Sequence, residues 1–536
     1  MLNASIAQMK TDGCIFKVVI DTSEIAGVPG GLTVGPTETV FLHVGEKHPA
    51  VPPDTYVEPD GRLLGYPHVI QGMQLCTYLD PGREWNPTYG LEQALERTRE
   101  WFDNAANDRF DPRTSLFHAV GGAPPTTIAV PIVVMRTAPP PLKAISICTL
   151  TPRPPARLDV SRWRSAPAVP GEVPAVVLKV PSPLSLGLGR TVAELATQIG
   201  HAGGAEPAQT IAAVLRGAER SKPGSPIHLG LVVAHPTEPD LPAVVFGMVM
   251  PPFSDKLRRR DVGLTPANTP IEWMPMSDER PDVTTPRDAR RPASALEGKV
   301  VEIWGCGGLG SWIAEFVVRA RPKRVTLRDG GQVHGGHLVR QNYLEADLGL
   351  PKAMALKSRL EALSDSAEIL VGSPSAEDAM SEGELPECDL IIDATINETV
   401  KHRLDAVAPA TSRPPLLVEV SLDRASGTLG LVIVAAPGSG VAPATVDRRL
   451  ESTALGSSEL EDFHDFWRPP PVGTELLPAP GCSTPTYHGS AADLAVVAGT
   501  MVNIIGQQLS SPVTGIHLFA SPHSGRTPPY RFIPDG

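Results

Sequence analysis

Residues 299–329 read KVVEIWGCGGLGSWIAEFVVRARPKRVTLRD, and this stretch decides the fold of the C-terminal part of the chain. KVVEIW (299–304) is a short apolar run typical of a buried strand, and SWIAEFVVRA (311–320) has the apolar spacing of a helix. The glycine-rich GCGGLG (305–310) joins them, and RVTLRD (324–329) is the next strand. This order predicts a unit of a doubly wound, parallel, Rossmann-like α/β sheet.

The glycine turn predicts a phosphate site at the N-terminus of the following helix. Its glycines let the backbone approach an anion where amide donors and the helix dipole favour negative charge. Asp329, about 20 residues farther on, suits a ribose hydroxyl of either a dinucleotide or ATP. The turn alone does not separate these ligands, so a nicotinamide dehydrogenase is one alternative. The residues of this predicted site are Gly305, Gly307, Gly308, Gly310 and Asp329.

Charged residues downstream of the turn favour a triphosphate. Arg340 and Gln341 end LVRQ, Lys352 follows, and Asp393 ends the predicted strand in DLIIDAT (389–395). Arginine and lysine can neutralise the charge that develops when a carboxylate attacks the α-phosphorus. An aspartate can hold Mg²⁺ near the same oxygens. The ordered set therefore predicts an Mg-ATP site, although each charge alone could be a solvated surface residue.

Together these segments resemble the E1-like (ThiF/MoeB-type) protein-adenylating superfamily, over the predicted domain 281–536. The resemblance implies that Mg-ATP and an acyl-adenylate bind to the glycine turn, Asp329, Arg340, Gln341, Lys352 and Asp393, with Arg340 and Lys352 catalytic.

The chain departs from the family pattern at two positions. Gly331 stands where the family has a second acidic residue, and His337 where it usually has asparagine. The resemblance also implies a homodimer in which an arginine crosses to the neighbouring site. Candidates for that arginine are Arg287, Arg290 and Arg291.

Cys482 is predicted to be catalytic. It lies in PAPGCSTPTYHGSAADL (478–494), between a proline-rich loop and a predicted helix over 490–508, whose N-terminus would favour the thiolate. The segment resembles the catalytic-cysteine segment of bacterial E1-like enzymes, which implies a thioester on Cys482. His488 is a candidate base, or alternatively an ordinary loop histidine.

Cys76 is the second candidate nucleophile. Strand-like runs at 14–22 and 38–44 precede it, and a predicted helix over 91–107 follows it in an α+β order. Residues 1–120 resemble the E2 ubiquitin-conjugating fold, which implies a thioester on Cys76. His68 stands in place of the family's asparagine and could donate a hydrogen bond to the oxyanion. The alternative is a degenerate E2 fold that serves only for docking.

Composition excludes several other classes. A net charge of −12 argues against nucleic-acid and anionic-membrane partners. With no signal-peptide pattern and no long apolar run, we expect a cytoplasmic protein. None of the six cysteines forms a CxxC pair, which argues against a zinc ribbon. The four that we expect to be packed are Cys14, Cys148, Cys306 and Cys388.

A length of 536 residues predicts about three domains. Proline clusters mark seams at 139–155 and 266–292, and the second cluster has the composition of a linker. Between domains 1–120 and 281–536 lies a mixed middle or linker domain, 121–280. It contains three predicted strands and a predicted helix over 191–217, but no motif that indicates chemistry.

This domain order resembles the E1–E2 fusion proteins of bacterial ubiquitin-like systems, notably those of CBASS antiviral operons. The resemblance implies ATP-dependent activation of the C-terminal glycine of a ubiquitin-like protein or a cGAS-like nucleotidyltransferase. Transfer from Cys482 to Cys76 and then to a target lysine would follow. The alternatives are a sulfur-carrier-type adenylyltransferase without conjugation, and a non-catalytic nucleotide-binding recruitment protein.

Overall fold

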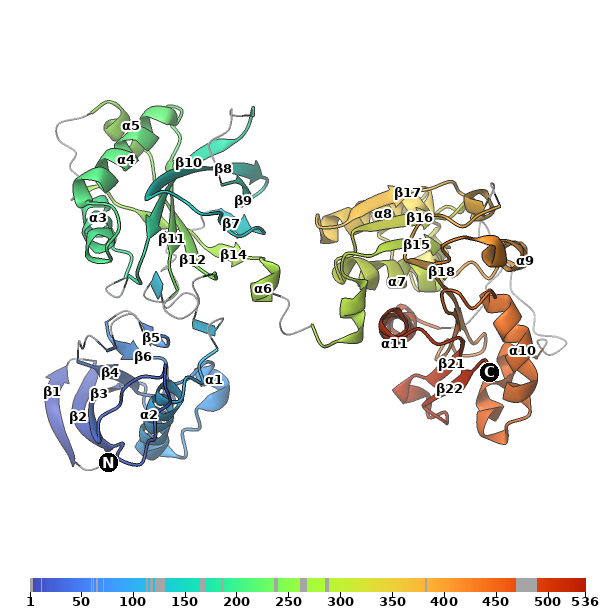
Figure 1. Cartoon of the computed structure of the whole chain (residues 1–536), viewed down its shortest axis with the longest axis horizontal. Helices are drawn as coiled ribbons and strands as arrows, with labels where there is room; N and C mark the ends of the chain where they lie inside the picture. The colour runs from blue at the N-terminus through green and yellow to red at the C-terminus, as the bar shows by residue number, and fades with distance from the viewer. Residues whose placement is uncertain are drawn as a thin grey trace. The chain divides into compact units, whose positions relative to one another are not determined.

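The computed structural model forms two compact units, Met1–Pro286 and Arg287–Gly536, which are described separately (Figure 1). It describes residues 3–10, 12–58, 60, 62–63, 66–70, 72–111, 114–115, 119–120, 131–163, 169–184, 187–235, 240–260, 268–284, 289–380, 383–468 and 489–536. No helix among these residues is long and apolar enough to cross a membrane.

The first unit begins with a six-stranded antiparallel sheet in the order β1-β2-β3-β4-β6-β5. Helix α2 (Gly90–Ala106) packs on this sheet through Trp101 and Phe102, which confirms the helix predicted over 91–107. The remaining elements are β1 (Asn3–Lys10), β2 (Gly13–Asp21), β3 (Thr37–Gly45), β4 (Asp54–Val57), β5 (Val69–Ile70), β6 (Gln74–Leu75) and α1 (Pro81–Glu84).

A second, eight-stranded sheet of mixed direction completes this unit, in the order β13-β12-β11-β10-β8-β9-β7-β14. The three strands predicted in the middle region are confirmed as β10, β11 and β12. The strands are β7 (Ile132–Met135), β8 (Ile145–Arg153), β9 (Arg157–Arg162), β10 (Val173–Val180), β11 (Ile227–Val233), β12 (Ala243–Val249), β13 (Glu272–Trp273) and β14 (Met276–Asp278). Short helices α5 (Phe253–Arg258) and α6 (Pro281–Thr284) accompany them. Because both sheets belong to one compact unit, the predicted boundary at 120/121 stays a prediction.

Two predictions for the middle region are wrong. The helix predicted over 191–217 is two helices, α3 (Val192–His201) and α4 (Pro207–Arg220). Gly203, with φ of +71°, and Pro207 interrupt the helical path between them. The stretch 266–292 is not only a linker, because β13 and β14 join the sheet there. Trp273 is 4% exposed, so its burial outweighs the proline-rich composition.

The second unit contains the predicted Rossmann-like sheet, in the order β17-β16-β15-β18-β19-β20-β21-β22. The strands from β17 to β19 are parallel, and those from β19 to β22 are antiparallel. The strands are β15 (Val300–Trp304), β16 (Arg324–Arg328), β17 (Glu368–Val371), β18 (Leu390–Asp393), β19 (Leu416–Leu422), β20 (Leu429–Ala435), β21 (Gly515–Ala520) and β22 (Tyr530–Pro534). The helices are α7 (Gly308–Arg319), α8 (Lys352–Leu363), α9 (Glu398–Val407), α10 (Pro443–Leu455) and α11 (Ala491–Ser510).

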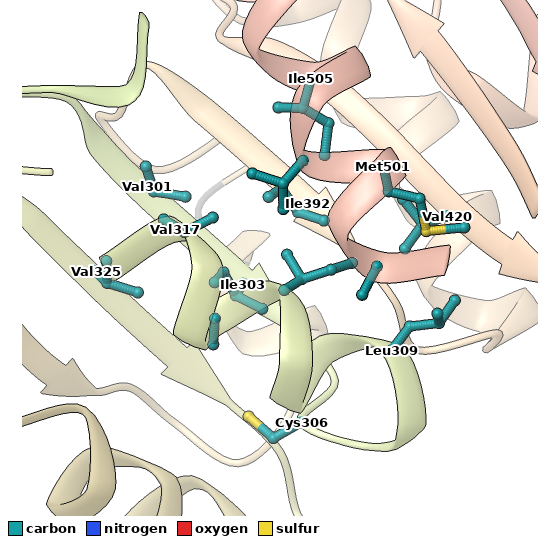
Figure 2. Close-up of a cluster of buried hydrophobic side chains, with 14 of the residues drawn as sticks. Val301, Ile303, Cys306, Leu309, Val317, Val325, Ile392, Val420, Met501 and Ile505 are labelled. Carbon is teal, nitrogen blue, oxygen red and sulfur yellow. The ribbon is translucent and has the colours of Figure 1, made fainter. Parts of the chain in front are cut away.

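Alternation along β15 builds a core on each face of this sheet. Val301 and Ile303 belong to the core formed with α7, α8 and α11, whereas Trp304 belongs to the core formed with α9 and α10. Figure 2 shows side chains of β15, β18, α7 and α11 meeting on the first face. Helix α11 confirms the helix predicted over 490–508. Both cores hold the carboxyl ends of β15, β16 and β18 in one row.

The cysteines predicted to be packed differ in burial. Cys148 and Cys306 are fully buried, as predicted. Cys14 and Cys388 are half-buried, at positions on or beside strands. Cys482 and His488 lie outside the described residues.

Candidate functional site

The glycine turn closes tightly at the end of β15. Gly305 has φ of +83°, and a Cβ there would lie 2.8 Å from the carbonyl oxygen of Ala394. A Cβ on Gly310 would lie 1.8 Å from the carbonyl oxygen of Gly305. Neither position therefore tolerates a side chain. At Gly307 a Cβ would meet no atom of the described chain within 4 Å, so the turn is open at the N-terminus of α7.

Asp329 holds the turn from the end of β16. Its Oδ2 accepts a hydrogen bond from Cys306 N at 2.7 Å, and its Oδ1 accepts one from Gly331 N at 2.7 Å. Each carboxylate oxygen keeps a further lone pair. Asp329, the residue predicted to bind the ribose, therefore lies beside the glycine turn and also holds its shape.

The side chain of Lys352 passes over Gly331. Lys352 begins α8, and its backbone N donates to Gly331 O at 2.9 Å. A Cβ on Gly331 would lie 3.0 Å from Asp329 Oδ1 and 3.5 Å from Lys352 Cδ. A Cβ at Gly331 would therefore make ordinary contact with the lysine stem, and its closest neighbour would be the carboxylate of Asp329.

The segment that carries Arg340 and Gln341 is fixed against α7. Trp312 Nε1 donates to Arg340 O at 3.0 Å, and Gln341 N donates to His337 O at 2.7 Å. Gln341 Oε1 is buried and has no hydrogen-bond partner within the described part of the chain. A buried acceptor without a partner is costly, so this atom fits a ligand that brings a donor.

His337 is a neutral imidazole beside these cations. It is 7% exposed, and its Nδ1 accepts a hydrogen bond from His334 N at 3.0 Å. Burial, and then the charge of Lys352, lowers the pKa of His337 to about 4. It therefore adds no third positive charge beside Lys352 and Arg340 at neutral pH.

Sequence reasoning missed Tyr343 and Asn342. Tyr343 Oη donates to Cys306 O at 2.6 Å, which anchors the glycine turn from the side opposite Asp329. Asn342 Nδ2 donates to Glu315 Oε2 at 2.6 Å and so ties the same segment to α7. The available signal was the position of both residues directly after Gln341.

Asp393 ends β18 beside the turn and is 2% exposed. Its Oδ1 accepts hydrogen bonds from Thr395 N at 2.9 Å and from Thr395 Oγ1 at 2.6 Å. Its Oδ2 is buried and lacks a partner among the residues that the structure describes. Burial raises the pKa of Asp393, so a cation would stabilise its ionised form.

These features fit Mg²⁺ as the cation. The unpartnered Oδ2 of Asp393 is a hard oxygen ligand of the kind that Mg²⁺ prefers. Within the described ranges, no group of three or more His, Cys, Asp or Glu side chains could hold a metal. One carboxylate together with waters and substrate phosphates is the usual binding mode of Mg²⁺.

Cys76 borders a cleft of about 550 Å³ in the first unit, which is also lined by His68, Leu79, Glu84, Arg97 and Trp101. Cys76 N donates to His68 O at 2.8 Å, and Cys76 Sγ donates to Tyr78 O at 3.5 Å. Burial, and then the charge of Glu84, raises the pKa of Cys76. The thiol is therefore protonated at neutral pH in this arrangement.

His68 lies in the same cleft wall with φ of +61°. Thr114 Oγ1 gives its proton to Asp111 O at 2.7 Å, so it accepts from Nε2–H of His68 at 3.1 Å. Burial lowers the pKa of His68 to about 4. The Nε2–H of His68, which was predicted to donate to an oxyanion, thus donates to Thr114. An oxyanion would have to replace Thr114 as its acceptor.

Helix α11, which follows Cys482 in the sequence, begins beside the segment that carries Arg340. Ala491 N, at the start of α11, donates to Val339 O at 3.0 Å, and Arg340 follows Val339 directly. Arg290 and Arg291, two of the candidate dimer arginines, are exposed, and Arg287 lies outside the described residues.

Comparison with known proteins agrees with this geometry. Residues 291–509 match the model of the ThiF family. The C-terminal unit carries a ThiF-type adenylation domain. The coarse E1-like prediction is thereby confirmed, whereas the E2 fold and the CBASS context stay predictions.

Individual relatives cover smaller parts of the chain. Molybdopterin-synthase adenylyltransferase of Escherichia coli K12 is 30% identical over 121 residues, 22% of this chain and 49% of that protein. The chain thus spans about half the length of that curated relative. Two solved structures, Escherichia coli MccB with succinimide and PaaA, align at 16% identity and a TM-score of 0.31. These alignments cover 45% of this chain and 66% and 75% of those chains.

Proposed function

We propose that this protein uses ATP to adenylate the C-terminal carboxylate of a small protein or peptide and then carries the acyl group on its own cysteines. The observation that carries the proposal is that several groups suited to a nucleotide lie at the same edge of the sheet. The glycine turn, Lys352 and the unpartnered oxygens of Gln341 and Asp393 all border the α7 N-terminus or the segment packed on it. Phosphates would meet the turn and Lys352, a hydroxyl or amino group of the nucleotide could donate to Gln341 Oε1, and Mg²⁺ would meet Asp393 Oδ2.

The first step forms a carboxylate O–P bond. The substrate carboxylate attacks the α-phosphorus of ATP, and the bond to the β-phosphate oxygen breaks, which releases pyrophosphate. Lys352 and Arg340 stabilise the charge that develops on the phosphate oxygens, and the amides at the start of α7 add to this. Asp393 would hold Mg²⁺, which supplies further neutralisation of phosphate charge when bound.

The second step transfers the acyl group to sulfur. The thiolate of Cys482 attacks the acyl carbon, and AMP leaves with the bonding electrons. Cys482 precedes Gly489 by seven residues, so an extended chain keeps it within roughly 25 Å of Gly489. The hydrogen bond between Ala491 and Val339 ties that end of the segment beside Arg340.

In the third step the Cys76 thiolate attacks the thioester, and the Cys482 thiolate leaves. A lysine amine then attacks the new thioester, and the Cys76 thiolate leaves as the amide forms. The Cys76 thiol must lose its proton first, because the thiolate is the nucleophile. A shared chain would give the two sulfurs an effective concentration of up to about millimolar. The activated partner would be a ubiquitin-like protein or a cGAS-like nucleotidyltransferase, and the enzyme a homodimer.

The test incubates the purified chain with Mg-ATP and a candidate partner that ends in glycine. Wild type, Cys482→Ala and Cys76→Ala are compared on non-reducing gels and by intact mass. The relay predicts a reductant-sensitive adduct that is absent in Cys482→Ala and remains on Cys482 in Cys76→Ala. Retention of the adduct in Cys482→Ala would contradict the assigned order.

A sulfur-carrier-type adenylyltransferase is the second candidate. The raised pKa of the Cys76 thiol favours it, because that reaction does not need Cys76. It predicts pyrophosphate release and AMP formation with no adduct in any lane. A recruitment protein without activity predicts nucleotide binding but no pyrophosphate exchange.

A further inference from the structure

Ile396 lies three residues after Asp393 and has a backbone conformation that is unfavourable for its side chain. Its φ is +52°, although isoleucine is branched at Cβ. Such residues rarely adopt left-handed backbone angles, and the conformation is strained. Glycine or asparagine would adopt it at lower cost.

Neighbouring hydrogen bonds impose this conformation. Thr395 Oγ1 donates to Asp393 Oδ1 at 2.6 Å and accepts from Asn397 N at 3.2 Å. Asn397 Oδ1 then accepts from Thr399 N at 2.9 Å and caps α9. The turn from β18 to α9 is therefore held on both sides of Ile396.

The result is an exposed apolar residue in the turn that follows Asp393. Ile396 is 56% exposed, so its side chain gains little from packing that would offset the strain. The preceding backbone lies against the glycine turn, since a Cβ on Gly305 would meet Ala394 O at 2.8 Å and Thr395 N at 3.0 Å. Ile396 thus directly follows backbone that contacts the glycine turn, three residues after Asp393.

Strand order indicates what Ile396 would meet. Asp329 on β16 and Asp393 on β18 lie on opposite sides of β15. A ribose held by Asp329 would lie toward β16, which would place the α-phosphate at the turn that follows β15. A group joined to that phosphate on the side of β18 would then approach Ile396.

We propose that Ile396 determines substrate specificity by contacting an apolar side chain next to the C-terminal glycine of the polypeptide that is adenylated. This inference rests on the proposed function and adds the chemistry of the tail. The hydrogen bonds of Thr395 and Asn397 fix the backbone of Ile396, so the contact needs little ordering of the enzyme when the tail binds.

A peptide library tests the contact directly. The peptides end in glycine, vary at the preceding position, and are selected on immobilised protein in the presence of α,β-methylene-ATP. Wild type should enrich apolar residues at that position by about tenfold or more over polar ones. Ile396→Asp should lose this preference and enrich lysine and arginine, whereas Ile396→Val should keep it.

Controls separate this effect from misfolding. Val513→Asp introduces the same charge at a residue of 43% exposure, beyond the far end of the 20-residue helix α11, and should leave the preference unchanged. The affinity for α,β-methylene-ATP should be equal in all variants. An unchanged preference in Ile396→Asp, no enrichment by wild type, or loss of nucleotide affinity would overturn the inference.

The proposed function fails differently. If the proposed function is wrong but the contact is right, the enriched peptides would bind and the preference would switch in Ile396→Asp. Wild type would then show no peptide-dependent exchange of pyrophosphate into ATP. The two failures are therefore distinguishable in one set of proteins.

Discussion

At the scale of single residues, the second unit keeps buried oxygens that lack partners. Asp393 Oδ2 and Gln341 Oε1 are the two beside the glycine turn within the described residues. A buried polar group without a partner costs about 1–3 kcal/mol. Such a cost is expected where a ligand supplies the missing interactions.

Asp393→Asn should remove function with little loss of stability. The amide keeps the size of the side chain but loses the charge that a cation needs, so pyrophosphate exchange should fall by about 100-fold or more. The melting temperature without ligand should change little, and its increase with Mg-ATP should shrink. Asp389→Asn, at the opposite end of β18, is the control and should retain exchange. Equal losses in both variants would contradict a role of Asp393 in binding.

Cys76 should react slowly with iodoacetamide at pH 7–8. Burial and Glu84 raise its pKa above the ordinary value, so the thiolate is scarce at neutral pH and increases as the pH rises. Glu84→Gln should increase the rate several-fold at pH 8, because one of the two causes is removed. Peptide mass spectrometry would measure the rate at Cys76 and, as an internal reference, at Cys14. A rate at Cys76 above that of a free thiol would contradict this assignment.

At the scale of elements, the glycine turn is held from two sides. Asp329 accepts from the backbone N of Cys306, and Tyr343 donates to the carbonyl oxygen of the same residue. The turn therefore has its shape before any ligand binds, which lowers the ordering cost of nucleotide binding.

Tyr343→Phe should weaken this preorganisation. The carbonyl of Cys306 would lose a buried donor, at a cost of about 1–2 kcal/mol, which corresponds to a drop of a few degrees in the melting temperature. Affinity for α,β-methylene-ATP should fall several-fold, as measured by calorimetry. Tyr89→Phe, at a residue of 62% exposure in the first unit, should change neither quantity. A normal affinity in Tyr343→Phe would show that the turn keeps its shape without the hydroxyl.

Short sequence patterns predicted the elements whose structure depends on neighbouring residues in the sequence. The order of β15, the glycine turn, α7 and β16 follows from apolar spacing and from glycines that no side chain can replace. Arg340 and Lys352 were predicted because a triphosphate site needs positive charge. The contacts of Tyr343 join residues 37 positions apart in the sequence, so no short pattern contains them.

Tertiary burial explains the two errors in the middle region. Trp273 is buried against β12 and draws a proline-rich segment into the sheet. Gly203 and Pro207 end one helix and begin another, although the apolar spacing continues across them. The hydrogen bond of His68 depends on Thr114, which the sequence did not link to it.

At the scale of the whole molecule, the two units should differ in their response to acid. Burial lowers the pKa of His68 and of His228, both in the first unit, to about 4. The folded state keeps its full stability above the unfolded pKa of 6.5. As the pH falls from there toward 4, the unfolded state binds protons that the folded state does not bind, so stability is lost. Each histidine contributes up to about 3 kcal/mol by this linkage.

The second unit has an opposing group. It also holds buried histidines, but burial raises the pKa of Glu419 to about 7, so acidification below pH 7 favours its folded form. We therefore expect the first unit to lose more stability than the second between pH 6.5 and 4.5. Hydrogen exchange measured by mass spectrometry at several pH values would assign the loss to each unit. Double substitution of His68 and His228 by glutamine should flatten the acid response of the first unit, and an unchanged response would refute this account.

The glycine turn also has a consequence for how the sequence can drift over generations. At positions 305 and 310 the protein itself forbids a side chain, because the nearest backbone atoms lie within 2.8 Å and 1.8 Å of any added Cβ. At position 307 the described chain leaves room for a Cβ, but φ of −80° with ψ of −143° lies outside the main allowed regions. Folding thus opposes alanine at 307 only through backbone strain, whereas it excludes alanine at 305 and 310 through collision. In a lineage that has lost the ligand, position 307 should therefore be the first of the three to change.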